Sequence, residues 1–173
     1  MSEPQTYPST NALLCSRLVD SEEETVNLAL NLARNLRAGD VVLLNGALGS
    51  GKTFFARALI QSRLFEIGAW EDVPSPSFTL VQEYDLGTDA LWHVDLYRLS
   101  GPDDIYELGL IDAFETAICL IEWPDRLGHL TPKNAITLKI RDKGETSRQF
   151  DFTFPDTDRG HLLAAAMTGA PAP

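Results

Sequence analysis

A glycine-rich stretch at residues 46–53 has the composition and spacing of a phosphate-binding loop. Its eight residues are Gly46, Ala47, Leu48, Gly49, Ser50, Gly51, Lys52 and Thr53. Glycines let successive backbone N–H groups approach a polyphosphate, because a side chain there would block the approach or strain the turn. Lys52 would bring a positive charge to the terminal phosphates, and the Thr53 hydroxyl would serve an accompanying magnesium ion. We therefore predict that these residues bind a nucleotide and that Lys52 is also catalytic.

The segments on both sides of this stretch support the prediction. The apolar run 41–44 precedes it with the composition of a buried strand, and residues 54–60 continue it as a helix. A helix that begins at such a loop adds its unpaired N–H groups and the positive end of its dipole. The alternative, a glycine-rich turn before an ordinary helix, explains fewer of these features. The order of the glycines also differs from that of the dinucleotide-binding fingerprint.

Asp95 is a candidate residue for the part of the site that would hold the metal ion. The apolar and aromatic segment 90–99 alternates in a way that predicts a strand with His93 and Asp95 on one face. Burying a carboxylate there is costly, so we expect Asp95 to bind the metal ion or to orient the attacking water as a catalytic residue. The alternatives are an ion pair with Arg98 or a turn-capping role. For His93, a hydrogen-bonded structural role is favoured.

Glu122 is the stronger acidic candidate. It directly follows the apolar run 117–121, which has the length of a buried strand. Nucleotide-hydrolysing folds place a magnesium-side carboxylate at the end of such a strand. The alternative is a carboxylate that caps a helix. The predicted metal ligands are thus Thr53, Asp95 and Glu122.

A proline-rich segment lies between the glycine-rich stretch and these acids. Pro74 and Pro76 exclude a helix and favour an extended, stiff loop, and residues 78–84 are predicted to continue as a strand. The small hydroxyl residues beside these prolines could present oxygens to a nucleotide or to a partner. A purely structural turn is an equally good explanation.

The remaining pattern predicts one α/β domain over residues 12–167, between flexible ends at 1–11 and 168–173. Ser21 and Glu24 have the spacing of a capping box that opens a helix. Further strands are expected at 12–19, 135–140 and 149–154, the last two as a hairpin, and further helices at 102–108, 112–116 and 158–167.

The composition limits the classes of partner. The chain has 14 Lys and Arg against 25 Asp and Glu, a formal net charge of −11. This charge repels phosphate backbones, which argues against free-standing binding to nucleic acid or to anionic membranes. The N-terminus lacks the features of a signal peptide, and no apolar run is long enough to span a bilayer. We expect a cytoplasmic protein in which Cys15 and Cys119 are buried free thiols.

Four blocks of the sequence, taken together and in order, resemble the bacterial TsaE (YjeE) family. They read LLNGALGSGKT at 43–53, PSPSFTLV at 74–81, HVDLYRL at 93–99 and CLIEWP at 119–124. The resemblance extends from about residue 21 to about residue 154. Some positions depart from the family's usual pattern: Ala47 stands for an Asp, Ser50 for an Ala, Phe54 for a Thr and Ser77 for a Thr.

The resemblance implies a P-loop NTPase-like three-layer fold with a mixed, mainly parallel central sheet, and an ATPase that uses ATP and Mg²⁺. Proteins of this family work with the TsaB and TsaD proteins in threonylcarbamoyladenosine (t6A) modification of tRNA at adenosine 37. Their ATP hydrolysis is taken to reset the TsaB–TsaD assembly. The resemblance places Lys52 at the phosphates, Thr53 and Glu122 at the magnesium ion, and Asp95 near the reaction centre.

The resemblance also assigns roles outside this set. It places Trp123 beside the nucleotide or a partner surface, with core packing as the alternative. It makes residues 75–79 a loop that moves with the nucleotide state, through Ser75, Ser77 and Thr79. Because the sequence shows no arginine finger, we expect weak hydrolysis by the isolated chain and a partner that completes the site.

Two rival functions use the same loop. A small-molecule kinase would share it, but the sequence shows no cluster of arginines for a lid over the acceptor. A nucleotide-gated interaction module would bind ATP in the same way, with hydrolysis incidental to its function.

Overall fold

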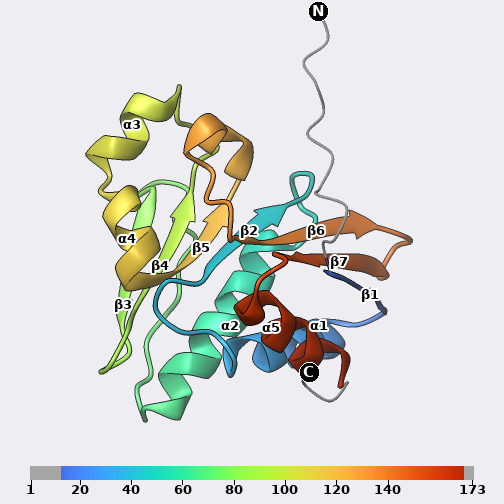
Figure 1. The fold of residues 1–173 in the computed structure, drawn as a ribbon. Helices are drawn as coiled ribbons and strands as arrows, with labels where there is room; N and C mark the ends of the chain where they lie inside the picture. The colour runs from blue at the N-terminus through green and yellow to red at the C-terminus, as the bar shows by residue number, and fades with distance from the viewer. Residues whose placement is uncertain (1–12, 170–173) are drawn as a thin grey trace, which may run out of the picture.

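A seven-stranded sheet forms the centre of the chain, in the order β1-β7-β6-β2-β5-β4-β3 (Figure 1). The computed structural model describes residues 13–169, so the flexible end predicted at 1–11 and residues 170–173 of the predicted tail lie outside the described residues. The strands are β1 Leu13–Val19, β2 Val41–Asn45, β3 Val81–Asp85, β4 Ala90–Asp95, β5 Ala117–Glu122, β6 Ile136–Asp142 and β7 Arg148–Phe154. The helices are α1 Glu22–Ala33, α2 Lys52–Glu66, α3 Pro102–Glu107, α4 Leu110–Thr116, the 3₁₀ helix η1 Pro124–Leu130 and α5 Asp158–Thr168.

The central strands of the sheet are parallel, and its two edges are antiparallel. Strands β6, β2, β5 and β4 pair in parallel, whereas β7 and β1 on one side and β3 on the other pair antiparallel. The sequences of β2 and β5 are almost continuous apolar runs, as expected for strands covered on both faces. Because parallel strands end at the same edge of a sheet, the residues that follow β2, β4 and β5 meet there. The α/β prediction is confirmed.

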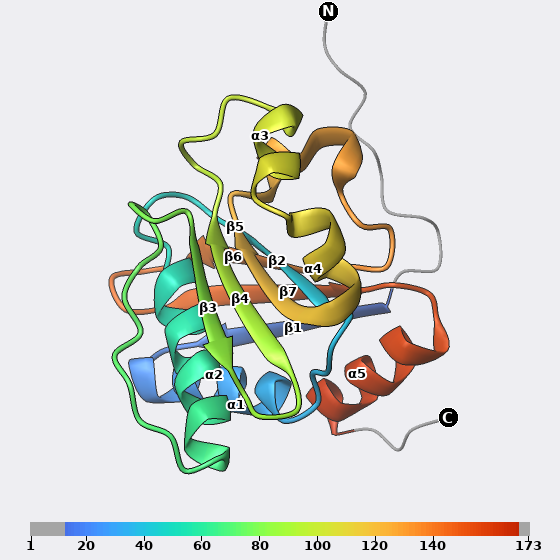
Figure 2. The ribbon, with the colours of Figure 1, turned by 90° about the vertical axis from the view of Figure 1, so that its left-hand side faces the viewer.

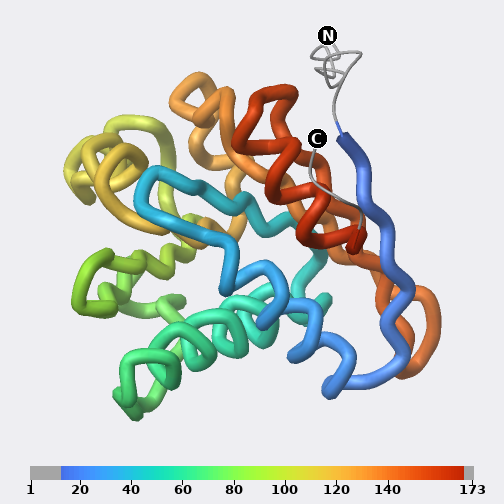
Figure 3. The backbone as a smooth tube through the Cα atoms, turned by 60° about the horizontal axis from the view of Figure 1, so that its bottom comes forward, coloured from blue at the N-terminus to red at the C-terminus, as the bar shows by residue number. Residues whose placement is uncertain are grey.

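Helices cover both faces of the sheet and create two apolar layers. Figure 1 shows α1, α2 and α5 on one face and α3, α4 and η1 on the other, and Figure 2 looks onto the edge formed by β3 and β4. Helix α5 lies beside β1, as Figure 3 shows, where Arg17 donates a hydrogen bond of 3.1 Å to the carbonyl of Met167. The side chain of Ser21 accepts from the backbone N–H of Glu24 at 3.1 Å at the start of α1, as the capping-box spacing predicts.

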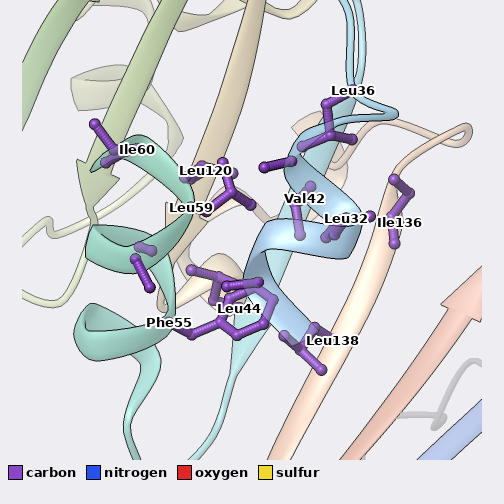
Figure 4. Close-up of a cluster of buried hydrophobic side chains, with 14 of the residues drawn as sticks. Leu32, Leu36, Val42, Leu44, Phe55, Leu59, Ile60, Leu120, Ile136 and Leu138 are labelled. Carbon is purple, nitrogen blue, oxygen red and sulfur yellow. The ribbon is translucent and has the colours of Figure 1, made fainter. Parts of the chain in front are cut away.

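The layer between α2 and the sheet holds the glycine-rich loop in place. Phe55, in the first turn of α2, is fully buried, and its ring centroid lies 5.8 Å from that of Phe150 on β7. Burying an aromatic side chain of this size stabilises the fold by roughly 1.5–3 kcal/mol. The start of α2 is therefore anchored to the sheet. Helix α1 contributes to the same apolar layer, and the labelled side chains in Figure 4 include Leu32 of α1 together with Val42, Leu44, Phe55, Leu59, Leu120 and Leu138.

Two predicted strand boundaries are wrong. Strand β3 begins at Val81 rather than at residue 78, because a turn precedes it: the N–H of Leu80 donates to the carbonyl of Pro76 at 2.7 Å, and Leu80 has a φ of 66°. Strand β4 ends at Asp95 rather than at residue 99. There the Asp95 side chain accepts from the N–H of Tyr97 at 3.0 Å, a turn that takes the chain out of the sheet.

The two cysteines are buried and free, as predicted. Burial raises the pKa of the Cys119 thiol to about 12, so this side chain packs as a small apolar group. None of the helices between residues 13 and 169 is long and apolar enough to cross a membrane.

Candidate functional site

The glycine-rich loop, residues 46–53, connects the end of β2 to the start of α2 with its backbone closely packed. Gly49 and Gly51 adopt φ values of 79° and 104°, in the left-handed region that favours glycine. A Cβ on Gly46 would lie 2.4 Å from Ser50 Oγ and 2.8 Å from the carbonyl oxygen of Ile140. The loop therefore depends on glycine both for its turns and for its contact with β6. Ser50 is itself buried, and its Oγ has no hydrogen-bond partner within residues 13–169.

Lys52 is held in the mouth of this loop. Its side-chain nitrogen donates to the carbonyls of Gly46 at 2.8 Å and Ala47 at 2.9 Å, and lies 4.2 Å from the ring centroid of Trp123. Only 4% of the residue is exposed. Burial lowers the pKa of Lys52 below its ordinary value, and the negative charges of Glu122 and Asp95 oppose this shift. The site thus contains one buried cation with two carboxylates near it.

Glu122 connects the loop to β4. It ends β5, is 2% exposed, and its Oε2 accepts the Thr53 hydroxyl at 2.9 Å. Its other oxygen, Oε1, lies 2.9 Å from Nε2 of the fully buried His93. The helix-capping alternative for Glu122 is not what the structure shows, because both carboxylate oxygens contact side chains of the site. The predicted hydrogen-bonded role of His93 agrees with this contact.

Asp95 lies beside Glu122, since the two residues are register partners at the ends of β4 and β5. Its Oδ2 accepts the Ser77 hydroxyl at 2.9 Å, and its Oδ1 accepts the N–H of Tyr97. The ion pair with Arg98 is absent from the ion pairs of residues 13–169, whereas the turn-capping alternative is present. Asp95 therefore faces the site and also fixes the end of its strand.

The proline-rich segment, residues 73–80, contacts the site at Asp95. Ser77 reaches Asp95, and its Oγ also lies 2.8 Å from Ser75 Oγ. Arg98 donates to the carbonyl of Phe78 at 2.7 Å, which ties the same segment to the turn after β4. Two further bonds hold the segment: Arg57 Nε donates to the carbonyl of Val73 at 2.8 Å, and the N–H of Asp95 donates to the carbonyl of Leu80 at 2.9 Å.

Trp123 follows Glu122 in a conformation that is rare for a residue other than glycine. Its φ and ψ are 58° and 52°, and its ring centroid lies 4.9 Å from that of Tyr97. One face of the ring meets Lys52. Such conformations cost roughly 1–3 kcal/mol and cluster at functional sites. Trp123 lines the cavity beside Lys52 and also packs, partly buried, against the apolar layer on the α3 and α4 side of the sheet, so both the predicted site placement and its core-packing alternative fit this geometry.

Three hollows surround the glycine-rich loop. A cavity of about 210 Å³ brings together Lys52, Thr53, Asp95 and Glu122, with Leu48, Gly49, Gly51 and Trp123. We call it the carboxylate cavity. A second hollow of about 570 Å³, the side cavity, shares Gly49 and Gly51 and is also lined by Ser50. Gly46 and Ala47 line a third, of about 660 Å³. Every predicted site residue therefore lies in or beside the loop, but on different sides of it.

The side cavity contains residues that the sequence did not single out for binding. Asp20, Ser21 and Arg148 line it together with Phe54. The antiparallel pairing of β1 with β7 brings them together, because Val19 and Arg148 are register partners. No local pattern marks residues so far apart in the chain, and only the tertiary pairing reveals them.

The described part of the chain contains no group of three or more His, Cys, Asp or Glu side chains arranged to hold a metal ion. Mg²⁺ usually keeps several waters and takes only one or two carboxylates together with substrate phosphates. The Thr53 hydroxyl and the Glu122 carboxylate, in contact with each other at the mouth of the loop, fit that mode of binding.

Comparison with known proteins identifies the family of this chain. The family model described as threonylcarbamoyl adenosine biosynthesis protein TsaE matches residues 19–150. A tRNA threonylcarbamoyladenosine biosynthesis protein TsaE from Rickettsia bellii is 43% identical over 127 residues, which cover 72% of this chain and 86% of the relative. The protein of the same name from Bacillus subtilis is 34% identical over 132 residues, 76% of this chain and 80% of the relative.

A solved structure supports the same conclusion. The crystal structure of Bacillus subtilis YdiB superposes with a TM-score of 0.74 at 27% identity, covering 93% of this chain and 98% of that chain. The residues matched by the family model, 19–150, include the glycine-rich loop and the strands that end beside it. This chain belongs to the TsaE family.

Proposed function

We propose that this chain is a magnesium-dependent ATPase that acts in threonylcarbamoyladenosine modification of tRNA, at adenosine 37, together with the TsaB and TsaD proteins. The observation that carries the proposal is the carboxylate cavity, where Lys52, Thr53, Asp95 and Glu122 meet at one end of the glycine-rich loop. The family is named for threonylcarbamoyl adenosine biosynthesis, which supports the assignment to that pathway.

The loop fits a polyphosphate. Its glycines bring the backbone close to the cavity, and the first turn of α2 presents unpaired N–H groups there. Lys52 carries the nearest positive charge, and among the described residues its side chain is hydrogen-bonded only to carbonyl oxygens of the loop. A phosphate oxygen is a stronger acceptor for an ammonium group than a neutral carbonyl, so the Lys52 side chain would turn from these carbonyls to the ligand.

The residues around the loop also fit the rest of a nucleotide. The side cavity joins the loop at Gly49 and Gly51 and offers the apolar faces of Phe54 and Phe150 beside the polar groups of Ser21 and Arg148. The rest of the lining is mostly polar and includes the carboxylates of Asp20, Glu22 and Glu145, which can accept hydrogen bonds from the hydroxyl and amino groups of a nucleoside. We place the nucleoside in the side cavity and the terminal phosphates beside Lys52.

Thr53 and Glu122 would hold the magnesium ion, and Asp95 lies beside them. When bound, the ion neutralises negative charge on the phosphates and polarises them toward attack. Lys52 adds positive charge, the loop N–H groups orient the phosphates, and Asp95 orients a water or a ligand of the ion. Because the transition state of phosphoryl transfer is loose, positioning and charge account for most of the catalysis.

A partner is expected to complete the site. Among the described residues that line the carboxylate cavity, Lys52 is the one cation. Efficient ATPases add a second cation at the transition state, supplied either by the same chain or by a partner. We therefore expect slow hydrolysis by this chain alone.

The contact between Ser77 and Asp95 favours a second candidate function, a nucleotide-gated interaction module. Asp95 has both carboxylate oxygens engaged, one of them by the proline-rich segment. Any ligand that draws the Asp95 carboxylate toward the proposed magnesium ion would break its hydrogen bond with Ser77. The nucleotide state would then control a surface segment, whether or not ATP is hydrolysed.

Ser77→Ala tests this connection. The variant loses the hydroxyl that donates to Asp95, and a hydrogen bond to a charged group contributes about 1.5–3 kcal/mol. We expect amide hydrogen exchange in residues 73–80 to become at least about tenfold faster, while ATP affinity changes by less than about threefold. Ser75→Ala is the matched control, because Ser75 contacts Ser77 but not Asp95. Equal exchange rates in Ser77→Ala and Ser75→Ala would refute the connection.

ATP turnover tests the proposed function directly. We would measure phosphate release with Mg²⁺ for this chain alone and then with purified TsaB and TsaD. Slow release that rises when the partners are added supports the proposal. If the partners leave the turnover rate unchanged and no complex with them is detected, the proposed role in tRNA modification is wrong. Phosphate that appears on an added metabolite instead of free in solution would indicate a small-molecule kinase.

A further inference from the structure

His93 is an unusual residue for its place in the sheet. It lies in β4 opposite Leu120 of β5, it is fully buried, and its strand neighbour on the same face is the fully buried Leu91. Its register partner on β3, Gln82, donates to the hydroxyl of Thr79 at 2.9 Å. Burying a polar imidazole costs free energy unless hydrogen bonds compensate it. Its role is therefore to be sought in the one hydrogen bond that its side chain makes within residues 13–169.

That hydrogen bond ends on Glu122. His93 Nε2 lies 2.9 Å from Glu122 Oε1, while Nδ1 is buried without a partner among the described residues. A proton on Nδ1 would be a buried donor with no acceptor, which costs about 1–3 kcal/mol. The contacts thus assign the proton to Nε2, which donates to the carboxylate.

The bond restricts the carboxylate of Glu122. The terminal torsion of a glutamate side chain is broad, so an unsupported carboxylate samples many orientations. With Oε1 held by His93, the other oxygen, Oε2, faces Thr53. His93 does not line the carboxylate cavity. It can act on a ligand there only through Glu122.

We propose that His93 is a positioning residue that orients Glu122 for magnesium binding. This inference rests on the proposed magnesium-dependent ATP binding. Residues that orient a ligand of a metal ion typically change metal affinity by about 10- to 100-fold when they are replaced. The side chain of His93 satisfies that description, because it fixes one oxygen of a carboxylate whose other oxygen faces the site.

The test compares two substitutions of His93 that introduce amide side chains of different length. In His93→Gln the amide nitrogen can take the place of Nε2, whereas in His93→Asn the shorter side chain extends only as far as Nδ1. Binding of a non-hydrolysable ATP analogue is measured by calorimetry, first in EDTA and then over a titration of Mg²⁺. Mg²⁺ should strengthen binding of the analogue, and the Mg²⁺ concentration that gives half of this effect is the measured quantity. We expect His93→Asn to raise that concentration by about 10- to 100-fold. We expect His93→Gln to stay within about threefold of the unmodified chain.

Leu91→Val controls for general weakening of β4. It removes one methylene from a fully buried side chain on the same face and should leave the Mg²⁺ dependence unchanged. The proposal would be overturned if His93→Asn had the same Mg²⁺ dependence as the unmodified chain. It would also be overturned if His93→Gln or Leu91→Val showed as large a defect in Mg²⁺ dependence as His93→Asn. If the unmodified chain binds the analogue without any response to Mg²⁺, the proposed magnesium site fails as well, and the two failures are distinguishable.

Discussion

Lys52→Ala is expected to weaken ATP binding by about 100-fold. The variant removes the one cation of the described residues that line the carboxylate cavity, and hydrogen bonds to charged groups contribute about 1.5–3 kcal/mol each. With each 1.4 kcal/mol worth about tenfold in affinity, one or two such bonds to phosphate oxygens account for the loss. The measurement is calorimetric titration with ATP and Mg²⁺.

The fold should survive this substitution. Burial lowers the pKa of Lys52, which means that the folded state disfavours the charged form that is present at neutral pH. Removing the side chain relieves that cost and leaves the carbonyls of Gly46 and Ala47 open to water in the cavity. Lys133→Ala is the matched control, because it removes an exposed lysine far from the loop in sequence. Unchanged ATP affinity in Lys52→Ala would show that the glycine-rich loop does not bind phosphates.

Glu122→Gln is expected to reduce ATP hydrolysis by at least about 100-fold. The substitution keeps the shape of the side chain and an oxygen for His93, but it removes the charge beside Thr53. A metal ion contributes several kcal/mol to the stabilisation of transition-state charge, and each 1.36 kcal/mol is about tenfold in rate. Phosphate release in the presence of TsaB and TsaD measures the effect.

The control for Glu122→Gln is Glu107→Gln, an exposed glutamate at the end of α3. If Glu122→Gln hydrolyses ATP at the full rate, Asp95 rather than Glu122 is the carboxylate that holds the magnesium ion. Loss of hydrolysis combined with retained ATP binding would allow the two candidate functions to be separated. If such a variant still supports tRNA modification, gating by ATP binding is sufficient, and the interaction-module function is favoured over the ATPase.

The sequence by itself determined the local features of the site. The spacing from Gly46 to Thr53 between an apolar run and a helical segment predicted the loop between β2 and α2, because backbone turns and helix starts are encoded by neighbouring residues. The apolar run before Glu122 predicted a buried strand, because its length and continuous apolar character are local properties of the sequence. The alternation in β6 and β7 around a polar turn predicted their hairpin.

Local turns closed by single hydrogen bonds limited the prediction of where strands begin and end. The end of β4 is decided by the contact between Asp95 and the N–H of Tyr97, and the start of β3 by the turn that closes on Pro76. Apolar periodicity continues through both points, so it carries no information about where the strands stop.

Only the tertiary structure decided which residues act together. Thr53 and Glu122 are 69 residues apart, and they meet because β2 and β5 are parallel neighbours that end at the same edge. The same arrangement gives Glu122 its second contact, with His93, and gives Asp95 its contact with Ser77. Strand order and register set these distances, and they follow from the packing of the whole core rather than from any local pattern.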